Sequence, residues 1–439
     1  MSSNFVIVCR KYYLIVLLSE LGFDLRSFNA VGNQTYAPVI SSINDIIAEH
    51  CTALKDSFGI TVKDKFMVLP KLFWIPKLHK NPYKSRFIAG ARNSTSKDLA
   101  ILVNKGLQLV RDKFSSYCLS IKHNSGVNAF WSINSSGEFL DRMSGLNCHS
   151  LQVYDFSTLY TNLNLDQVME SLKDLCELIF SSSKSFICIG YYRTFFSNKK
   201  YRGYHCWSKT QFLNAISFIL NNTFVTFGGL VFKQIRGIPM GGNSSSLLAD
   251  LFLAYREFYF VRGLLASRRF GLAKLLSRTT RYVDDICVFN FKHFDKILPE
   301  IYPVDLLACR SGDNNKCVNY LDVKIRIEDG GHYITEVYHK VDEFSFPVVL
   351  YTFPESNMPL NTGLNIFAAQ LIRFARISSD ASAFISRAKG IFDIFKGRGY
   401  KNNLLVNSCI KSFSKNRFLV FKFGCFSPRQ MPSIIGMLG

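Results

Sequence analysis

Several features that would place the sequence in a familiar class of protein are missing from it. Its 12 cysteines include no C-x-x-C pair, which argues against a zinc ribbon and favours reduced, mostly buried thiols in an intracellular protein. The apolar run at residues 12–18 is too short to span a bilayer, and it lacks the small-residue cleavage pattern of a signal peptide. There is no internal repeat and no low-complexity segment. We therefore expect a globular intracellular protein without a transmembrane helix.

Acidic residues are also scarce relative to basic ones. The 439-residue chain has 32 Asp and Glu against 53 Lys and Arg, a formal net charge of +21, and the positive residues are spread along the chain. This predicts a polyanionic partner, nucleic acid before membrane, although a merely basic protein has the same composition. The length favours two or three packed lobes over a single core.

Local patterns predict a mixture of strands and helices. Residues 4–9 predict a strand, and the basic, aromatic residues 71–90 predict an extended ribbon with a turn. Gly228 and Gly229 separate two alternating apolar runs and therefore predict a β-hairpin. Residues 181–204 are rich in Ser, Lys and Tyr, and we expect them to form a surface insertion.

One candidate carboxylate lies in the segment LQVYDF. Residues 151–156 alternate in a way that predicts a strand ending near Asp155. Asn164, with Gln167 three residues later, has the pattern of a helix N-cap. An aspartate at the end of a strand and just before a helix occupies the position where α/β proteins place ligand sites.

Two more carboxylates interrupt the apolar segment RTTRYVDDICVF, residues 278–289. Aspartate is depleted from strands, so Asp284 and Asp285 require a compensating role. In a strand–turn–strand hairpin Asp284 could meet Asp155, and two such carboxylates repel unless cations lie between them. Oxygen ligands without His or Cys suit Mg²⁺ or Mn²⁺. In a basic protein this pattern predicts two-metal phosphoryl transfer.

The order of several motifs resembles a known family. DFSTLY, GIPMGGNSS and YVDD resemble motifs A, B and C of reverse transcriptases. IPKLHK, YLDVKI, ITEVYHKVD and RFARISSD resemble blocks of the Penelope-like retroelements, which are relatives of telomerase reverse transcriptase. The resemblance covers nearly the whole chain. It implies an α+β right-hand polymerase with fingers (1–145), a palm whose antiparallel sheet is backed by helices (146–345), and a helical thumb (346–439).

The resemblance also implies an activity and partners. The chain would be an RNA-directed DNA polymerase of a Penelope-like retroelement that extends a DNA 3′-end with dNTPs by two-metal-ion catalysis, using two Mg²⁺ ions or Mn²⁺. Its expected partners are an RNA template, a DNA primer and dNTPs, with no membrane, and its expected location is nuclear. The sequence contains no GIY-YIG endonuclease motif, so we expect an endonuclease-lacking form or a fragment. A catalytically inactive RNA- or DNA-binding protein with the same fold, and a DNA-templated polymerase, are the alternatives.

Metal ligands follow from the resemblance residue by residue. Asp155 and Asp284 match the metal-bridging aspartates, and the backbone carbonyl of Phe156 would complete the coordination of the nucleotide-bound ion. Asp285 matches the third carboxylate, which has less direct contact with metal. An isolated Asp would more often be a helix or turn cap, but here three carboxylates occur in family order.

Nucleotide contacts follow in the same way. Lys77 and Arg86 match the residues that pair with the triphosphate. Tyr160 matches the aromatic residue beneath the incoming sugar, which selects deoxynucleotides, and Met240 and Gly241 match the segment facing the nascent base pair. The ordinary alternatives are a core tyrosine, a solvated lysine and a methionine that only packs.

The C-terminal segment completes the expected contacts with nucleic acid. Residues 361–415 read as helical and carry many basic residues, among them Arg373 and Arg376. The resemblance makes this segment the thumb, which would grip the primer–template duplex through its phosphates. A solvated helix face is the alternative.

Overall fold

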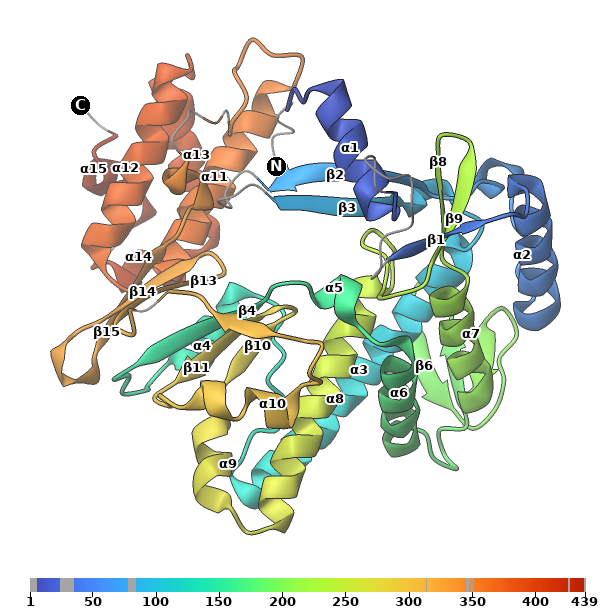
Figure 1. Ribbon diagram of the computed structural model, residues 1–439. Helices are drawn as coiled ribbons and strands as arrows, with labels where there is room; N and C mark the ends of the chain where they lie inside the picture. Colours follow the sequence, from blue (N-terminus) through green and yellow to red (C-terminus); the bar gives the residue numbers. More distant parts are fainter. Residues whose placement is uncertain are drawn as a thin grey trace.

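A computed structural model of the protein describes residues 6–23, 35–77, 84–312, 314–344, 348, 350–424 and 427–437. Helices and largely antiparallel sheets make up the chain, as the α+β prediction requires (Figure 1). Two large hydrophobic cores contain most of the buried side chains.

The N-terminal region combines helices with a five-stranded sheet, which also receives a hairpin from the middle of the chain. Its elements are α1 (Arg10–Glu20), β1 (Tyr36–Val39), α2 (Ile43–Phe58), β2 (Lys71–Lys77), β3 (Lys84–Gly90), β8 (Phe224–Phe227) and β9 (Leu230–Gln234). The strand order is β1-β9-β8-β2-β3.

Most local predictions for this region are confirmed. The ribbon over 71–90 is the antiparallel pair β2–β3, although its turn lies outside the described residues. Gly228 and Gly229 form the hairpin turn with φ of +60° and +82°, the left-handed conformation that a two-residue turn of this kind requires. The strand predicted over 4–9 is wrong for residues 6–9, which are irregular and lead directly into α1.

A four-stranded sheet in the order β10-β11-β4-β12 lies between the two hydrophobic cores. Its strands are β4 (Leu151–Phe156), β10 (Thr280–Tyr282), β11 (Asp285–Phe289) and β12 (Ala308–Arg310). One face packs on the first core, which includes α3 (Lys97–Ser125), α6 (Leu165–Ile179) and α8 (Ser245–Ala266).

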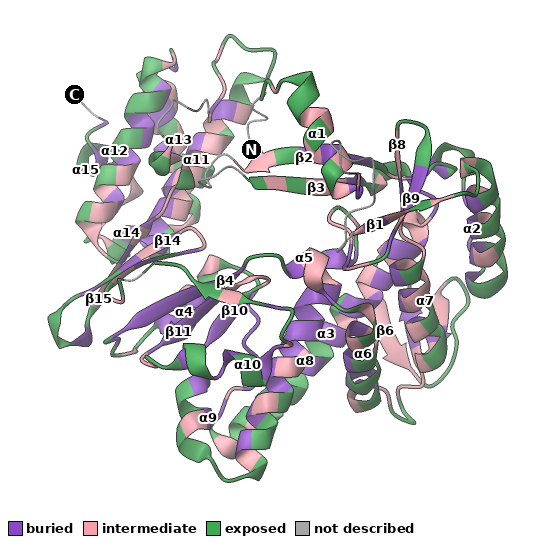
Figure 2. Cartoon of the chain, in the orientation of Figure 1, coloured by how far each residue is buried: buried purple, intermediate pink, exposed green. Residues whose placement is uncertain are grey.

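Alternation along β4 and β11 explains how this sheet separates the two cores. Tyr154 and Ile286 face the helices of the first core, whereas Val153 and Cys287 face the second core. Successive residues of a strand point to opposite faces, so a strand buried on both faces is nearly continuously apolar. Most residues of β4, β10 and β11 are buried, and these strands are largely purple in Figure 2.

The segment expected to be a surface insertion is only partly on the surface. It forms the sheet β6-β5-β7, made of β5 (Phe186–Ile189), β6 (Thr194–Ser197) and β7 (His205–Ser208), and is followed by α7 (Lys209–Asn221). Ile187 and Ile189 are fully buried. A Cβ added to Gly106 of α3 would overlap the ring of Phe212 and approach Ile187, so the sheet packs closely on α3 and α7.

The C-terminal region builds the second core from a three-stranded sheet and a group of helices. Its elements are β13 (Cys317–Tyr320), β14 (Val323–Ile327), β15 (Tyr333–Val337), α11 (Leu360–Ile377), α12 (Ala381–Gly397), α13 (Asn402–Lys415), α14 (Arg417–Lys422) and α15 (Met431–Ile435). The helical prediction for residues 361–415 is therefore confirmed. Among the described residues, no helix has the length and apolar character needed to cross a bilayer.

Candidate active site

The turn between β10 and β11 carries Asp284. Tyr282 pairs with Asp285 at the base of the hairpin, so Val283 and Asp284 form the two-residue turn. Val283 has φ of +53°, which is unfavourable for a β-branched residue. The guanidinium of Arg281 donates from Nη1 to the Val283 carbonyl at 2.9 Å. This contact from a buried side chain holds the turn in its strained conformation.

Strand β4 brings Asp155 to the same place. β4 and β11 are antiparallel neighbours, with Asp155 opposite Asp285, and residues opposite one another project from the same face of a sheet. The backbone N–H of Phe156 donates to the Asp284 carbonyl at 3.2 Å. The three predicted carboxylates therefore lie on two adjoining strands and the turn between β10 and β11.

Positive side chains from β2 and β3 face these carboxylates. Burial raises the pKa of Asp284, and the charge of Asp155 raises it further, while Lys77 and Arg86 lower it. Burial also raises the pKa of Tyr160, which lies within electrostatic reach of Asp284 and Arg86. Cations and carboxylates that are distant in sequence thus meet at one place.

A cavity of about 760 Å³ occupies this place. Its wall includes every residue predicted to contact the nucleotide together with one of the three predicted catalytic carboxylates: Lys77, Arg86, Phe156, Tyr160, Met240, Gly241 and Asp284. Asp155 and Asp285 do not line it but lie beside Asp284 in the sheet. The volume is in the range of pockets that hold a ligand of nucleotide size.

A glycine-rich loop closes one side of the cavity by approaching two other backbones. A Cβ on Gly237 would overlap the carbonyl of Tyr160, and a Cβ on Gly241 would overlap the carbonyl of Ala89. The Ala89 N–H also donates to the Met240 carbonyl at 2.9 Å. Only glycine permits this packing, and the loop is thereby fixed against both β3 and the segment that carries Tyr160.

A buried cluster of charges beneath the turn was not predicted. Arg281 is 0 % exposed and forms ion pairs with Asp250, at 2.8 Å, and with Glu257, both on α8. Asp250 also pairs with Arg111 of α3 at 3.0 Å. Burial opposes the charge on Arg281, but Glu257 and Asp250 outweigh it and raise its pKa. The seven-residue spacing of Asp250 and Glu257, two turns apart among apolar residues of one helix, was the available signal.

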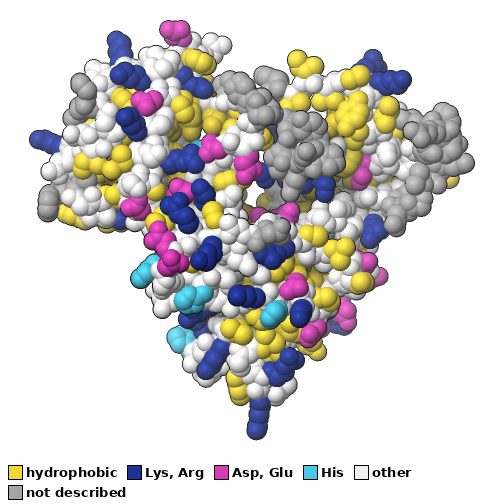
Figure 3. All heavy atoms as spheres, turned by 60° about the vertical axis from the view of Figure 1, so that its left-hand side comes forward, with side chains coloured by type: hydrophobic (Ala, Val, Ile, Leu, Met, Phe, Trp, Pro, Cys, Tyr) yellow, Lys and Arg dark blue, Asp and Glu magenta, His cyan; other side chains and the backbone are white. Residues whose placement is uncertain are grey.

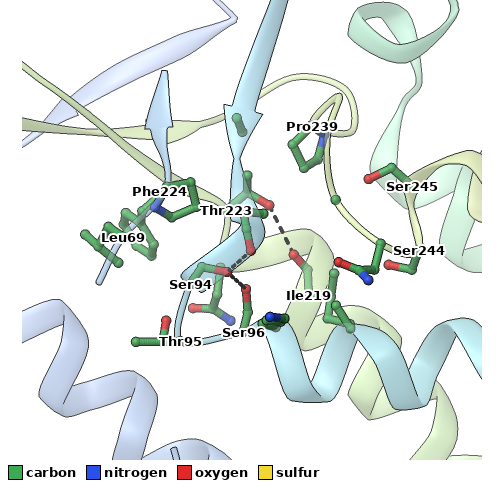
Figure 4. Close-up of a pocket in the computed structure, with 18 of the residues that line it drawn as sticks. Leu69, Ser94, Thr95, Ser96, Ile219, Thr223, Phe224, Pro239, Ser244 and Ser245 are labelled. Atoms are coloured by element: carbon green, nitrogen blue, oxygen red, sulfur yellow. Dashed lines mark hydrogen bonds between the residues drawn. The ribbon is translucent and has the colours of Figure 1, made fainter. Parts of the chain in front are cut away.

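A second cavity, of about 40 Å³, lies behind the glycine-rich loop (Figure 4). It is lined by His50, Thr95 and Ser244, among others, and the Nδ1 atom of His50 is 2.9 Å from the Thr95 hydroxyl. Burial lowers the pKa of His50 to about 4, so the ring is neutral at pH 7. The small size of this cavity and the polar side chains among its lining residues suit a buried water rather than a nucleotide.

The two arginines predicted to bind duplex lie apart from this site. Arg373 on α11 pairs with Asp322 at 2.7 Å, and Arg376 is exposed and contacts Asn416. Neither arginine lines the larger cavity. Figure 3, which brings this side of the molecule forward, shows basic and acidic side chains interspersed over the face.

The oxygen atoms at this site suit Mg²⁺ ions that are bound jointly by the protein and a substrate. Within the described ranges, no three His, Cys, Asp or Glu side chains gather into a ready-made metal site. Mg²⁺ is commonly held by one or two carboxylates together with substrate phosphates. Asp155, Asp284 and the Phe156 carbonyl offer oxygen ligands of that type.

Comparison with known proteins gives a likeness in fold. No family model and no curated protein matches the sequence. A chain in the structure of telomerase from Candida albicans, in complex with the TWJ fragment of telomeric RNA, matches with a TM-score of 0.56 at 13 % identity. The match covers 84 % of this chain and 63 % of that one, so the present chain spans less than two thirds of the telomerase chain. The chain has a reverse-transcriptase-like polymerase fold.

Two other solved structures match at lower scores. Telomerase from Candida tropicalis, also with the TWJ fragment of telomeric RNA, has a TM-score of 0.44 at 12 % identity, covering 98 % of this chain and 63 % of its own. The RNA-dependent RNA polymerase of a human picobirnavirus has a TM-score of 0.46 at 10 % identity, with coverages of 84 % and 65 %.

Proposed function

We propose that the protein is an RNA-directed DNA polymerase, which extends a DNA 3′-end with dNTPs on an RNA template. The observation that carries the proposal is the meeting of Asp284 with Lys77 and Arg86 at one cavity of about 760 Å³, with Asp155 close enough to raise the pKa of Asp284. Paired carboxylates opposite paired cations suit a triphosphate held between metal ions and positive side chains. The polymerase-like fold of the chain supports the same function.

The side chains at this cavity each have a part in nucleotide transfer. Lys77 and Arg86 would neutralise the charge that develops on the triphosphate. Tyr160 would lie beneath the sugar and disfavour a 2′-hydroxyl, while Met240 and Gly241 would face the new base pair. The oxygens of Asp155 and Asp284, with the Phe156 carbonyl, would hold two Mg²⁺ or Mn²⁺ ions, and Asp285 would be the third carboxylate. Such ions supply a lowered pKa for the attacking hydroxyl and stabilise the leaving group.

We also propose roles for the three parts of the chain. Fingers (1–145), palm (146–345) and thumb (346–439) would surround the primer–template, with Arg376 available for phosphate contact. Arg373 would act there only after leaving Asp322, because the two side chains are 2.7 Å apart. The quoted blocks support membership of a Penelope-like retroelement, whose chromosomal target would place the protein in the nucleus.

Primer extension tests this proposal directly. With Mg²⁺ and a poly(rA)/oligo(dT) primer–template, the wild-type protein should incorporate dTTP, and Asp284→Ala should reduce the rate by at least about a thousandfold. Asp305→Ala is the matched control, because Asp305 is exposed and does not line the cavity. Circular dichroism should show that both variants are folded.

The alternative is a binding protein that retains the fold without the activity. A wild-type protein that binds the duplex but incorporates nothing with either Mg²⁺ or Mn²⁺ would support that alternative. Equal activity of the wild type and Asp284→Ala would instead exclude the carboxylate site as the catalytic centre.

A further inference from the structure

Two exposed tyrosines stand at the tip of the β5–β6 hairpin. Tyr191 is 84 % exposed and Tyr192 is 94 % exposed, and their ring centroids are 4.6 Å apart. The backbone beneath them is fixed, since the ammonium group of Lys105 donates to the carbonyls of Gly190 and Tyr191 at 2.9 Å each. Neighbouring large aromatic rings in water are a feature of interaction sites, unlike single exposed apolar residues.

A hollow of about 250 Å³ adjoins this tip. Its floor comes from α3, where Leu109 supplies an apolar surface and the amide of Gln108 donates to the Asp112 carboxylate at 3.0 Å. Tyr191 and Tyr192 form part of the opposite wall. None of the residues that line this hollow lines the cavity next to Asp284, so the two places are separate.

The surroundings of the tip are strongly basic. Residues 178–249 contain no Asp or Glu. The β5–β7 segment, by contrast, is rich in cations, of which the exposed ones are Arg193, Lys199, Lys200 and Arg202. Another exposed tyrosine, Tyr201, has the Lys199 ammonium 5.6 Å from its ring centroid. The only carboxylate in the wall of the hollow is that of Asp112.

We propose that this tip binds an unpaired base of single-stranded RNA. Tyr191 and Tyr192 supply the stacking faces, and Gln108 and Asp112 supply an amide and a carboxylate that can bond the polar edge of a base. The surrounding cations contact the phosphates on either side. A duplex keeps its bases stacked inside the helix, so the site favours a single strand.

The proposal rests on the proposed function only in naming RNA as the strand. A polymerase that copies RNA has unpaired template outside its catalytic cleft, and the tip offers that strand a second point of attachment. Stacking and phosphate contact are not tied to catalysis, so binding at the tip is measurable without nucleotide incorporation.

Fluorescence anisotropy with a labelled single-stranded RNA of about 12 nucleotides tests the site. Combined substitution of Tyr191→Ala and Tyr192→Ala should weaken binding by about 5- to 100-fold, the loss expected from one stacked base. The matched control is Tyr259→Ala, since Tyr259 is 65 % exposed on α8 in a hollow that also contains Glu300. That control should bind as the wild type does.

The same variants with an RNA duplex of equal length decide between the possible outcomes. A loss confined to the single strand supports the base site, whereas equal losses for both probes, or no loss for either, overturn it. Primer extension by the tyrosine variant on a template without a single-stranded tail should remain at the wild-type rate. If the wild type shows no polymerase activity but the tip variant still loses single-stranded RNA, the proposed function fails and this inference stands.

Discussion

Arg281 is the residue whose loss should most strongly destabilise the centre of the molecule. Its Nη1 atom donates to the Asp250 carboxylate and to the Val283 carbonyl, and its Nε and Nη2 atoms donate to Glu257. The last N–H donates to the Asp250 carbonyl at 3.1 Å. All five guanidinium donors are therefore used inside a fully buried environment. Arg281→Met keeps the apolar stem and removes every one of these bonds.

The expected loss follows from what remains buried. Asp250 keeps its pair with Arg111 at 3.0 Å, whereas Glu257 keeps only its hydrogen bond from the Tyr302 hydroxyl, at 2.7 Å, among the described side chains. Breaking a buried ion pair by removing one partner costs about 3–5 kcal/mol, because the other charge is left without compensation. Adding Glu257→Gln removes that charge, so the double variant should be more stable than Arg281→Met alone by about 1–3 kcal/mol.

Urea unfolding at pH 7, followed by circular dichroism, measures these changes in the free energy of unfolding. Lys209→Met is the matched control, because the Lys209–Glu177 pair is partly exposed and its loss should cost less than about 1 kcal/mol. If Arg281→Met costs no more than Lys209→Met, or if Glu257→Gln makes it worse, the buried cluster does not stabilise the protein as described.

Three further predictions concern the cavities and the loop. Burial lowers the pKa of His50 from 6.5 to about 4. The neutral ring therefore contributes stability above pH 6.5, and about 3 kcal/mol of the free energy of unfolding is lost as the pH falls from 6.5 to 4. If urea unfolding gave the wild type and His50→Gln the same dependence of this free energy on pH, the prediction would be contradicted. Gly237→Ala should lower the rate of primer extension at least about tenfold, because the added Cβ displaces the Tyr160 carbonyl. Gly203→Ala should not lower the rate, because Gly203 has a similar φ but no atom near its added Cβ. Equal rates for the two variants would contradict the effect of the overlap at Gly237. Tyr160→Ala should raise the ratio of kcat/KM for ribonucleotides to kcat/KM for deoxynucleotides about tenfold, or ~1.4 kcal/mol. An unchanged ratio would show that Tyr160 does not select the sugar.

Local patterns were sufficient for the strands and turns that carry the carboxylates. The alternation that ends at Asp155 and the interruption of an apolar hairpin by Asp284 are features of short segments, which is why they could be read directly. Their meeting with Lys77 and Arg86 depends on the packing of distant strands, and only the family resemblance predicted it.

Two features of the structure could not be predicted from the local composition of the sequence. Ser, Lys and Tyr dominate residues 181–204 and obscure the short buried strand β5, so the segment read as surface. Asp250 and Glu257 lie in a largely apolar helix, and their partner Arg281 is distant from them in sequence and comes just before the Asp284–Asp285 pair. A buried charge becomes recognisable once its counterion is located, and that requires the tertiary structure.

The choice of template and nucleotide tests the central claim most directly. The rate of synthesis should be compared on RNA and DNA templates of one sequence, with the same DNA primer, Mg²⁺, and either dNTPs or NTPs. We expect dNTP incorporation on the RNA template that disappears with Asp284→Ala. Incorporation of NTPs alone, or synthesis on the DNA template alone, would contradict an RNA-directed DNA polymerase.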